Sequence, residues 1–246
     1  MIAFARIVMY HGGMIPQFVI PAIIPESYDY LQSRLRDLRR TVHRVQVDVM
    51  DGTYTRAASW PYTGADRAAF EAIRREDEGL PYWQDFDFEI DLMVREPEKH
   101  IAEWSLAGAA CVIIHAESTD HMDDVIAAAN ERRLEVALAL KPSTDIERIA
   151  PFVHEVQFVQ CMGSDSIGTH GVALEDRAIA QVRALRARWP DIAIGVDIGV
   201  SAQTIPTLLD AGATRFAAGS AIFLAHDSRI AWKELERMVR DIHHAS

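Results

Sequence analysis

The sequence of 246 residues is poor in cysteine and has no apolar run long enough to cross a bilayer. Its two cysteines, Cys111 and Cys161, each lie inside an apolar, strand-like run. This favours buried packing and argues against a disulfide framework or a thiolate zinc site. The first ten residues, MIAFARIVMY, are interrupted by Arg6 and lack the cleavage pattern of a secretory signal. We therefore expect a soluble, cytoplasmic protein with no membrane partner.

Basic residues are also scarce, because 25 Lys and Arg face 36 Asp and Glu, which gives a formal net charge of −11. Nucleic acid and anionic membranes repel such a chain, so neither is expected as a partner. An anionic ligand must instead be held by a local site. The apolar fraction of 49% is enough for one large core, and an α/β barrel of this length is commonly one domain.

Strand-like and helix-like segments alternate along the chain. In the clearest strand, RVQVDVMDG at Arg44–Gly52, three valines give β-branched stiffness and the run breaks at Asp-Gly. This is typical of a buried parallel strand. Eight strands are predicted: Phe18–Ile24, Arg44–Val49, Phe86–Met93, Cys111–His115, Leu134–Leu140, Val156–Cys161, Ile192–Asp197 and Arg215–Ala218.

The segments between the strands have helical periodicity and boundary signals such as Pro97, Gly108 and Gly212. Eight strand–helix units in one chain of this size predict a single (β/α)8 TIM barrel over 1–246, with a short N-terminal extension. A doubly wound open sheet is the alternative, but GxGxxG is absent. The predicted helices are Tyr28–Arg40, Asp66–Glu78, Pro97–Leu106, His121–Arg132, Thr144–Phe152, Leu174–Trp189, Ala202–Ala211 and Ser228–His243.

Barrel active sites lie at the carboxyl ends of the strands. Three carboxylates, Asp48, Asp91 and Asp197, occupy such positions, and their mutual repulsion would require a proton, a cation or a reacting substrate. A functional site is therefore expected there. The other residues at strand ends are Ala22, Gln46, His115, Lys141, Gln160–Met162 and Gly219-Ser220.

Glycine turns follow the last two strands, at Asp197–Val200 and Ala218–Ala221. Barrels commonly bind a phosphoryl group with the backbone amides of these two turns, beside a short helix. The loop GSDSIGTHG, Gly163–Gly171, could add amides and hydroxyls after the sixth strand.

The second βα segment, residues 52–85, is enlarged and rich in aromatic residues, including Tyr54, Trp60 and Tyr62. Three interpretations remain open from the sequence: a lid over the substrate, a contact between copies of the chain, or a small local core.

Five blocks in order resemble the ribulose-phosphate 3-epimerase family: VDVMDG at 47–52, DLMVREPEKHI at 91–101, AGAACVIIHAE at 107–117, ALALKPST at 137–144 and GVDIGVSAQTIPTLLDAGATRFAAGSAIF at 195–223. The resemblance implies a ribulose-phosphate-binding barrel. Enzymes of this family invert one carbon of a phosphorylated ketopentose, with two aspartates as acid and base and a divalent metal against the enediolate. It also implies a small phosphorylated sugar as the ligand and a homo-oligomer.

The resemblance assigns roles to individual residues. Asp48 and Asp197 match the two catalytic aspartates. Met50 and Met93 match apolar residues of the pocket floor, and His115 in the HAE block joins the substrate-binding residues. The phosphate-loop positions fall on Gly199, Gly219 and Ser220.

Departures from the family pattern concentrate at the metal site, where two histidines fall on Gln46 and Asp91. The implied ligand set of Gln46, Asp48, Asp91 and Asp197 contains only oxygen ligands. It favours manganese or magnesium over zinc, and a metal-free site is the alternative. A serine expected in the first strand is Ala22, and a glycine expected after the seventh is Ile198.

The leading hypothesis is an epimerase or isomerase of a phosphorylated ketose that moves a proton between two aspartates through an enediolate. The alternative is a catalytically silent barrel that binds a sugar phosphate or a partner protein. Aldol or decarboxylase chemistry is less favoured, since the lysine of an Asp-x-Lys-x-x-Asp site falls on Met50.

Overall fold

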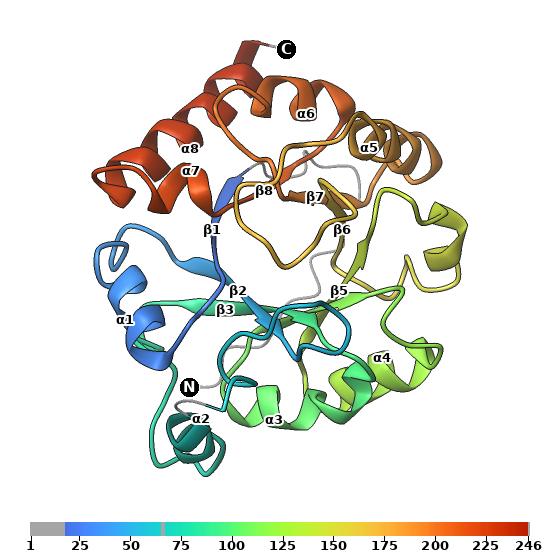
Figure 1. The fold of residues 1–246 in the computed structure, drawn as a ribbon. Coiled ribbons are helices and arrows are strands. Elements are labelled where there is room, and N and C mark those ends of the chain that lie inside the picture. Colours follow the sequence, from blue (N-terminus) through green and yellow to red (C-terminus); the bar gives the residue numbers. More distant parts are fainter. Residues whose placement is uncertain (1–17, 65–66, 246) are drawn as a thin grey trace.

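Eight parallel strands close into a barrel in the computed structural model, which describes residues 18–64 and 67–245. Each strand pairs with the next along the chain, and β8 pairs with β1 (Figure 1). The strands are β1 Phe18–Ile23, β2 Arg44–Met50, β3 Asp87–Met93, β4 Cys111–His115, β5 Glu135–Leu140, β6 Phe158–Met162, β7 Ala193–Asp197 and β8 Arg215–Ala218. The predicted (β/α)8 fold is confirmed, whereas the N-terminal extension lies outside the described residues.

Helices surround the barrel as an outer ring (Figure 1). They are α1 Tyr28–Arg36, α2 Arg67–Arg74, α3 Ile101–Leu106 after the short 3-10 turn η1 Pro97–Lys99, α4 Met122–Glu131, α5 Asp176–Arg188, α6 Ile205–Ala211, α7 Ser220–Phe223 and α8 Ser228–Ala245. No helix within these residues has the length and apolar character to cross a membrane.

The predicted fifth helix, Thr144–Phe152, is wrong. Only a 3-10 turn, η2 Ile146–Ile149, forms there. The Asp145 side chain accepts the Glu147 N–H at 3.0 Å and starts this turn. Ala150 keeps helical backbone angles and donates to the Glu147 carbonyl at 3.2 Å, but Pro151 has no N–H with which to continue the hydrogen-bonded turn.

Alternation along each strand separates two faces. On β2, Val45, Val47 and Val49 belong to the large core between the strands and the helices, and the residues between them face the barrel interior. A second, smaller core inside the barrel includes Cys111 and Phe158. Both cysteines are buried and free, as predicted.

Helix α8 fastens the last part of the described chain to the first strand. Its Glu236 carboxylate accepts the Val19 N–H at 2.8 Å. The Trp232 indole N–H donates to the Val19 carbonyl at 2.9 Å. These bonds stabilise the strand that closes the barrel.

Part of the enlarged segment 52–85 forms one of the predicted structures, a small local core. The Trp60 side chain is fully buried and meets the Phe70 ring edge-on with 5.6 Å between centroids. Phe70 in turn contacts Trp104 of α3 at 4.9 Å. This part is a local aromatic core, whereas Tyr54 reaches the strand ends described below.

Candidate active site

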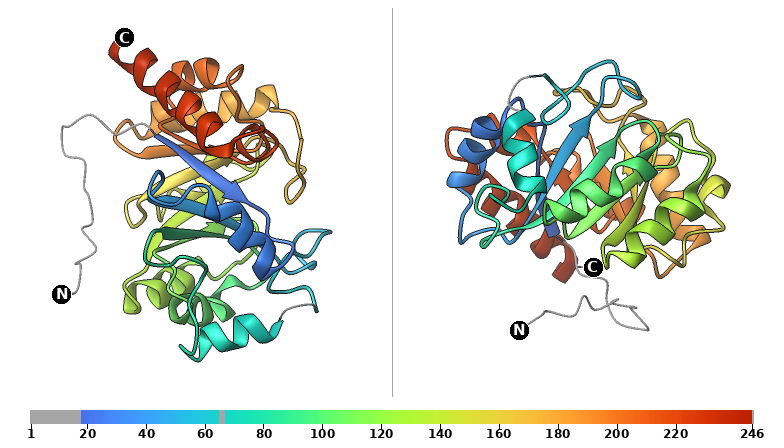
Figure 2. Two further views of the ribbon diagram at one scale, coloured as in Figure 1. Left: turned by 90° about the vertical axis from the view of Figure 1, so that its left-hand side faces the viewer. Right: turned by 90° about the horizontal axis from the view of Figure 1, so that it is seen from below.

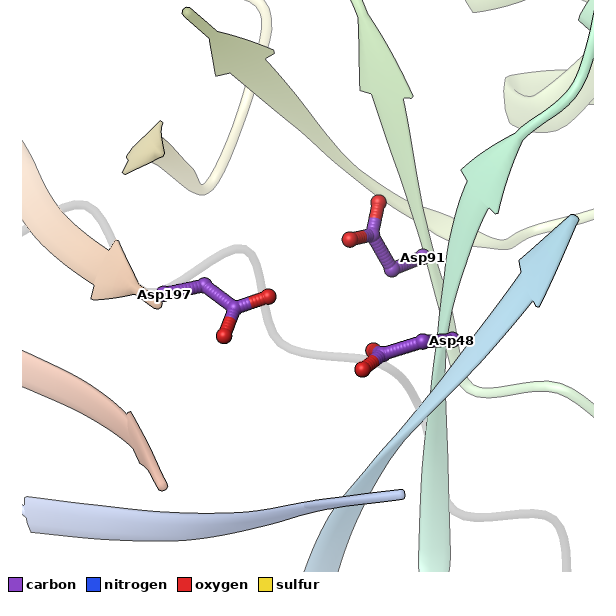
Figure 3. Close-up of side chains that lie close together, drawn as sticks. All are labelled: Asp48, Asp91 and Asp197. Atoms are coloured by element: carbon purple, nitrogen blue, oxygen red, sulfur yellow. The ribbon is translucent and has the colours of Figure 1, made fainter. Parts of the chain in front are cut away.

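Three aspartates from three strands point toward one another at the carboxyl end of the barrel (Figure 3). Asp48 lies on β2, Asp91 on β3 and Asp197 at the end of β7. Each offers a carboxylate oxygen within 4.8 Å of the other two, and all three residues are buried. Figure 2 shows the β2 arrow pointing toward the loop of residues 52–64 that follows it. The predicted convergence of these carboxylates is therefore present in the structure.

The amide of Gln46 joins two of the three carboxylates. Its Nε2 donates to Asp48 Oδ1 at 2.8 Å and to Asp197 Oδ2 at 3.0 Å. The amide oxygen, Oε1, is buried and has no hydrogen-bond partner among the described residues. A neutral side chain thus links the two aspartates without neutralising their charge.

The pKa values of both linked aspartates are raised. Burial raises the pKa of Asp48 well above its usual value, and the charges of Asp197 and Asp91 raise it further. Burial and Asp91 raise the pKa of Asp197 to about 7, although the N–H groups of Ile198 and Gln46 oppose the shift. Both carboxyl groups therefore hold a proton more readily than an exposed aspartate does.

His115 contacts Asp91 from the neighbouring strand. Its Nε2 lies 3.0 Å from Asp91 Oδ1, and neither side chain is exposed. Asp91 Oδ2 and His115 Nδ1 are buried without partners among the described residues. The imidazole therefore lies beside one of the clustered carboxylates.

Tyr54 covers this part of the site. Its ring centroid is 5.3 Å from that of His115, and its hydroxyl donates to Glu117 Oε2 at 3.0 Å. Two cations lie over the same ring, Lys141 with its Nζ at 4.7 Å and Arg95 with its Cζ at 5.6 Å from the centroid. The sequence located Lys141 at a strand end, but the contact with Tyr54 depends on the fold of the enlarged segment.

A pocket opens beside Asp48 and Asp197 and encloses about 540 Å³ of space that is continuous with solvent. The predicted phosphate-binding positions line this pocket together with Met93. His170 also lines it, although the sequence analysis did not identify this residue. The predicted residues on the pocket are Asp48, Met93, Asp197, Gly199, Gly219 and Ser220, and the loop after β6 adds Gly168–Val172, including His170.

Two methionines at the carboxyl end of the barrel differ in their relation to the pocket. Met162 lines the pocket from β6, whereas Gln160 does not. The two residues share a face of the strand, but Met162 is the last residue of β6 and pairs with Asp197. Met50 is buried beneath the loop after β6: a Cβ built on Gly168 would lie 2.5 Å from Met50 Sδ. Met50 thus supports that loop and is not among the pocket-lining residues.

The turn after β7 is built from two residues with left-handed backbone, Ile198 at φ 76° and Gly199 at φ 75°. A Cβ on Gly199 would lie 2.6 Å from the Leu174 backbone nitrogen, so this position requires glycine. Ile198 has no such freedom, and a β-branched residue in this region is strained. In this turn the Ile198 N–H donates a hydrogen bond to Asp197 Oδ1 at 2.7 Å.

A closed parallel (β/α)8 barrel with buried acidic residues and a pocket at its strand ends defines a TIM-barrel protein with the active-site layout of that class. The chain belongs to the ribulose-phosphate 3-epimerase family, because the profile of that family matches residues 18–223. The family resemblance seen in the sequence is thereby confirmed.

Two curated relatives support this membership. Ribulose-phosphate 3-epimerase of Schizosaccharomyces pombe is 30% identical over 216 residues, which cover 86% of this chain and 89% of the relative. The second relative is the cytoplasmic isoform of ribulose-phosphate 3-epimerase from rice, Oryza sativa subsp. japonica. It is 25% identical over 210 residues, which cover 83% of this chain and 86% of the relative. These relatives are carbohydrate epimerases by name, as the sequence predicted for this family.

The fold also resembles a solved structure of 3-hexulose-6-phosphate synthase from Salmonella typhimurium. The TM-score is 0.68 at 15% identity, over 91% of this chain and 99% of that chain. At this identity the likeness concerns the barrel alone.

Proposed function

We propose that this protein is an epimerase of a phosphorylated ketose in which Asp48 and Asp197 are the proton-transferring pair. One observation carries the proposal: two buried carboxylates from β2 and β7 share one amide donor, and burial raises the pKa of both, that of Asp197 to about 7. General acid–base catalysis needs such values. Membership in a family of named epimerases supports the same reaction class.

The proposed reaction starts with a ketose bound so that the carbon next to its carbonyl lies between the two aspartates. The ionised aspartate removes the proton from that carbon and leaves an enediolate. The protonated aspartate then returns a proton to the opposite face, which inverts the carbon, and the pair ends with its protonation states exchanged. Because the pair is symmetric in this respect, the same residues serve both directions.

The donor set fits a hard divalent cation. Three carboxylate oxygens lie within 4.8 Å of one another, and oxygen ligands favour magnesium or manganese over zinc. Gln46 would join Asp48, Asp91 and Asp197 as a ligand only if its amide turned, because its NH₂ group now faces the carboxylates. A bound cation would stabilise negative charge on the enediolate oxygens, and without one the Gln46 amide and shared protons offset the repulsion.

The phosphate end of the pocket is proposed at Gly199, Gly219 and Ser220, which line it. Backbone amides hold a phosphoryl group without a cationic side chain, which suits an acidic protein. The reacting end has an amide and a carboxylate, Gln46 and Asp91, at the two positions of family histidines. We therefore expect weak turnover of ribulose 5-phosphate and tighter binding of another phosphorylated sugar.

The test is a thermal-shift panel of phosphorylated pentoses and hexoses, with and without manganese, followed by NMR of each hit in deuterated water. A ligand that stabilises the protein and gains deuterium beside its carbonyl supports the enzyme. Efficient epimerisation of ribulose 5-phosphate contradicts the altered substrate preference.

A catalytically silent barrel remains the second candidate, because Gln46 and Asp91 occupy both family histidine positions. Stabilisation by a sugar phosphate without deuterium exchange would favour it. The cytoplasmic location, the homo-oligomer and the absence of nucleic-acid binding stay predictions. The first agrees with the name of the rice relative.

A further inference from the structure

His115 and Asp91 form a pair that lies wholly inside the protein. Asp91 is at its register position beside Ile113 of β4, and His115 is two residues further along that strand. The imidazole therefore lies on the carboxyl-end side of the aspartate. Its Nε2 is 3.0 Å from Asp91 Oδ1, and both side chains are fully buried. A carboxylate only accepts hydrogen bonds, so Nε2 carries the hydrogen in this contact.

The other oxygen of Asp91 is free for a ligand. Asp91 Oδ2 is buried and has no hydrogen-bond partner among the described residues, and Figure 3 shows the Asp91 carboxylate directed into the space shared with Asp48 and Asp197. An unpartnered buried oxygen is costly unless something binds it. A divalent cation among the three carboxylates would supply that partner.

The imidazole is itself held in position. The Tyr54 ring lies 5.3 Å from the His115 ring, and Ser118 donates to the His115 carbonyl through both its N–H at 3.0 Å and its hydroxyl at 2.7 Å. The backbone and the ring are thus fixed from two sides. A rigid donor fixes the rotamer of the acceptor that it contacts.

We propose that His115 is a positioning residue for metal binding: it donates to one oxygen of Asp91 and thereby holds the other oxygen toward Asp48 and Asp197 as a cation ligand. The inference rests on the proposed function for the presence of a cation. In this proposal the His115 imidazole acts on the cation indirectly, through Asp91, the carboxylate at the position of a family histidine. Outer hydrogen-bond partners of metal ligands typically change metal affinity by about 10–100-fold.

The experiment measures manganese affinity of the metal-free protein by titration, with the EPR signal of free Mn²⁺ as the readout. His115→Leu removes the donor at similar volume, whereas His115→Gln keeps an N–H donor at nearly the same distance from the backbone. His121→Leu is the matched control, because His121 and Asp124 form a similar pair at 3.9 Å on the surface. Thermal unfolding of each variant reports folding separately from metal binding.

We expect His115→Leu to weaken manganese binding about 10–100-fold, His115→Gln to recover most of the affinity, and His121→Leu to leave it unchanged. Because His115 acts through Asp91, His115→Leu should add nothing to Asp91→Asn in the double variant. Unchanged affinity in His115→Leu, equal losses in Leu and Gln variants, or additive effects with Asp91→Asn would overturn the proposal.

Two measurements on the wild-type protein, manganese binding and deuterium exchange, distinguish a failure of this inference from a failure of the proposed function. Deuterium exchange of a ketose phosphate by wild type that binds no manganese would overturn the role of His115 and leave the epimerase standing. Manganese binding that depends on His115, with no exchange for any ligand of the panel, would support the positioning role and contradict the epimerase.

Discussion

Two buried acidic clusters lie inside the same barrel, and they differ in how their charge is compensated. Strand β3 contributes to both, with Glu89 to the amino-end cluster and Asp91 to the carboxyl-end cluster, and both are fully buried. At the carboxyl end, Asp91 meets two further carboxylates and no Arg or Lys ion pair among the described residues. At the amino end, each carboxylate contacts a guanidinium.

The amino-end cluster is an ion-pair network. Glu89 Oε1 accepts from Arg215 at 2.5 Å and from Arg44 at 3.1 Å, and Arg44 also contacts Glu135 at 2.9 Å. Burial lowers the pKa of Arg44, but Glu89 and Glu135 outweigh it and raise the pKa overall. The Arg215 guanidinium also lies over the Phe158 ring, 3.7 Å from its centroid.

The comparison shows that buried carboxylates alone do not identify an active site. Buried carboxylates that are paired with cations have a structural role, because removing one partner leaves an uncompensated buried charge. Where they repel one another and their pKa values rise, the fold keeps an unfavourable arrangement that a substrate, a proton or a cation can relieve. The same strand supports both because its inward positions lie in different layers of the barrel.

The largest expected effect is on catalysis at the carboxyl end. Asp48→Asn and Asp197→Asn should each lower epimerisation by about 10²–10⁴-fold, since one proton-transfer partner is lost. Each variant should still exchange the α-proton of one epimer with deuterated solvent, but not of the other, which NMR measures. The control is Asp210→Asn, an exposed aspartate paired with Arg183. Wild-type epimerisation by Asp48→Asn would contradict the assignment.

The next effect concerns stability, and its sign should differ between the two clusters. Glu89→Gln leaves Arg215 without its buried counter-charge and should cost about 3–5 kcal/mol of unfolding free energy. Asp48→Asn removes like-charge repulsion and should gain about 1 kcal/mol. Urea unfolding at pH 8 measures both, with the exposed Glu131→Gln as the control. A lower free energy of unfolding in both Glu89→Gln and Asp48→Asn would contradict the expected difference between the two clusters.

The pH dependence of stability sharpens the same contrast. An acid whose pKa is raised on folding stabilises the protein fully below its unfolded value, 3.8 for Asp197, and loses that contribution as the pH rises to about 7. The stability advantage of Asp197→Asn over wild type should therefore grow between about pH 4 and about pH 7, by up to about 1.4 kcal/mol per pH unit. Urea unfolding across this range measures it. Parallel curves for the two proteins would show that Asp197 is not perturbed by the cluster.

The smallest expected effect is at the turn that follows β7. Ile198→Gly and Ile198→Ala both remove the side chain beyond Cβ, so their difference reports mainly the effect of a Cβ on the backbone conformation. Gly is normally less stable than Ala, but at φ 76° the order should reverse, with Gly more stable by about 1 kcal/mol. Chemical denaturation of the pair measures this difference. An Ala variant that equals or exceeds the Gly variant would argue against strain at this turn.

Much of the fold was predictable because strand periodicity and turn residues are local signals. β4 and β8 have the predicted bounds, and the positions of Asp48 and Asp197 at strand ends follow from valine alternation and the glycine turns. The fifth helix was not predicted correctly, because the helical pattern of apolar residues was followed through Pro151, which has no N–H to continue the hydrogen-bonded turn. His170 was missed, since a loop without periodicity gives no indication of where its side chains lie.

The sequence by itself determined eight parallel strands and carboxylates at three strand ends, because these features depend on residues close together in the chain. Only the tertiary structure decided which groups meet. Register pairs Asp48 with Asp91 across β2 and β3, and Met162 with Asp197 across β6 and β7. The bond from Gln46 to Asp197 spans 151 residues of sequence. A shift of one residue in a strand would turn these side chains to the other face, so barrel closure and not local propensity assembled the site.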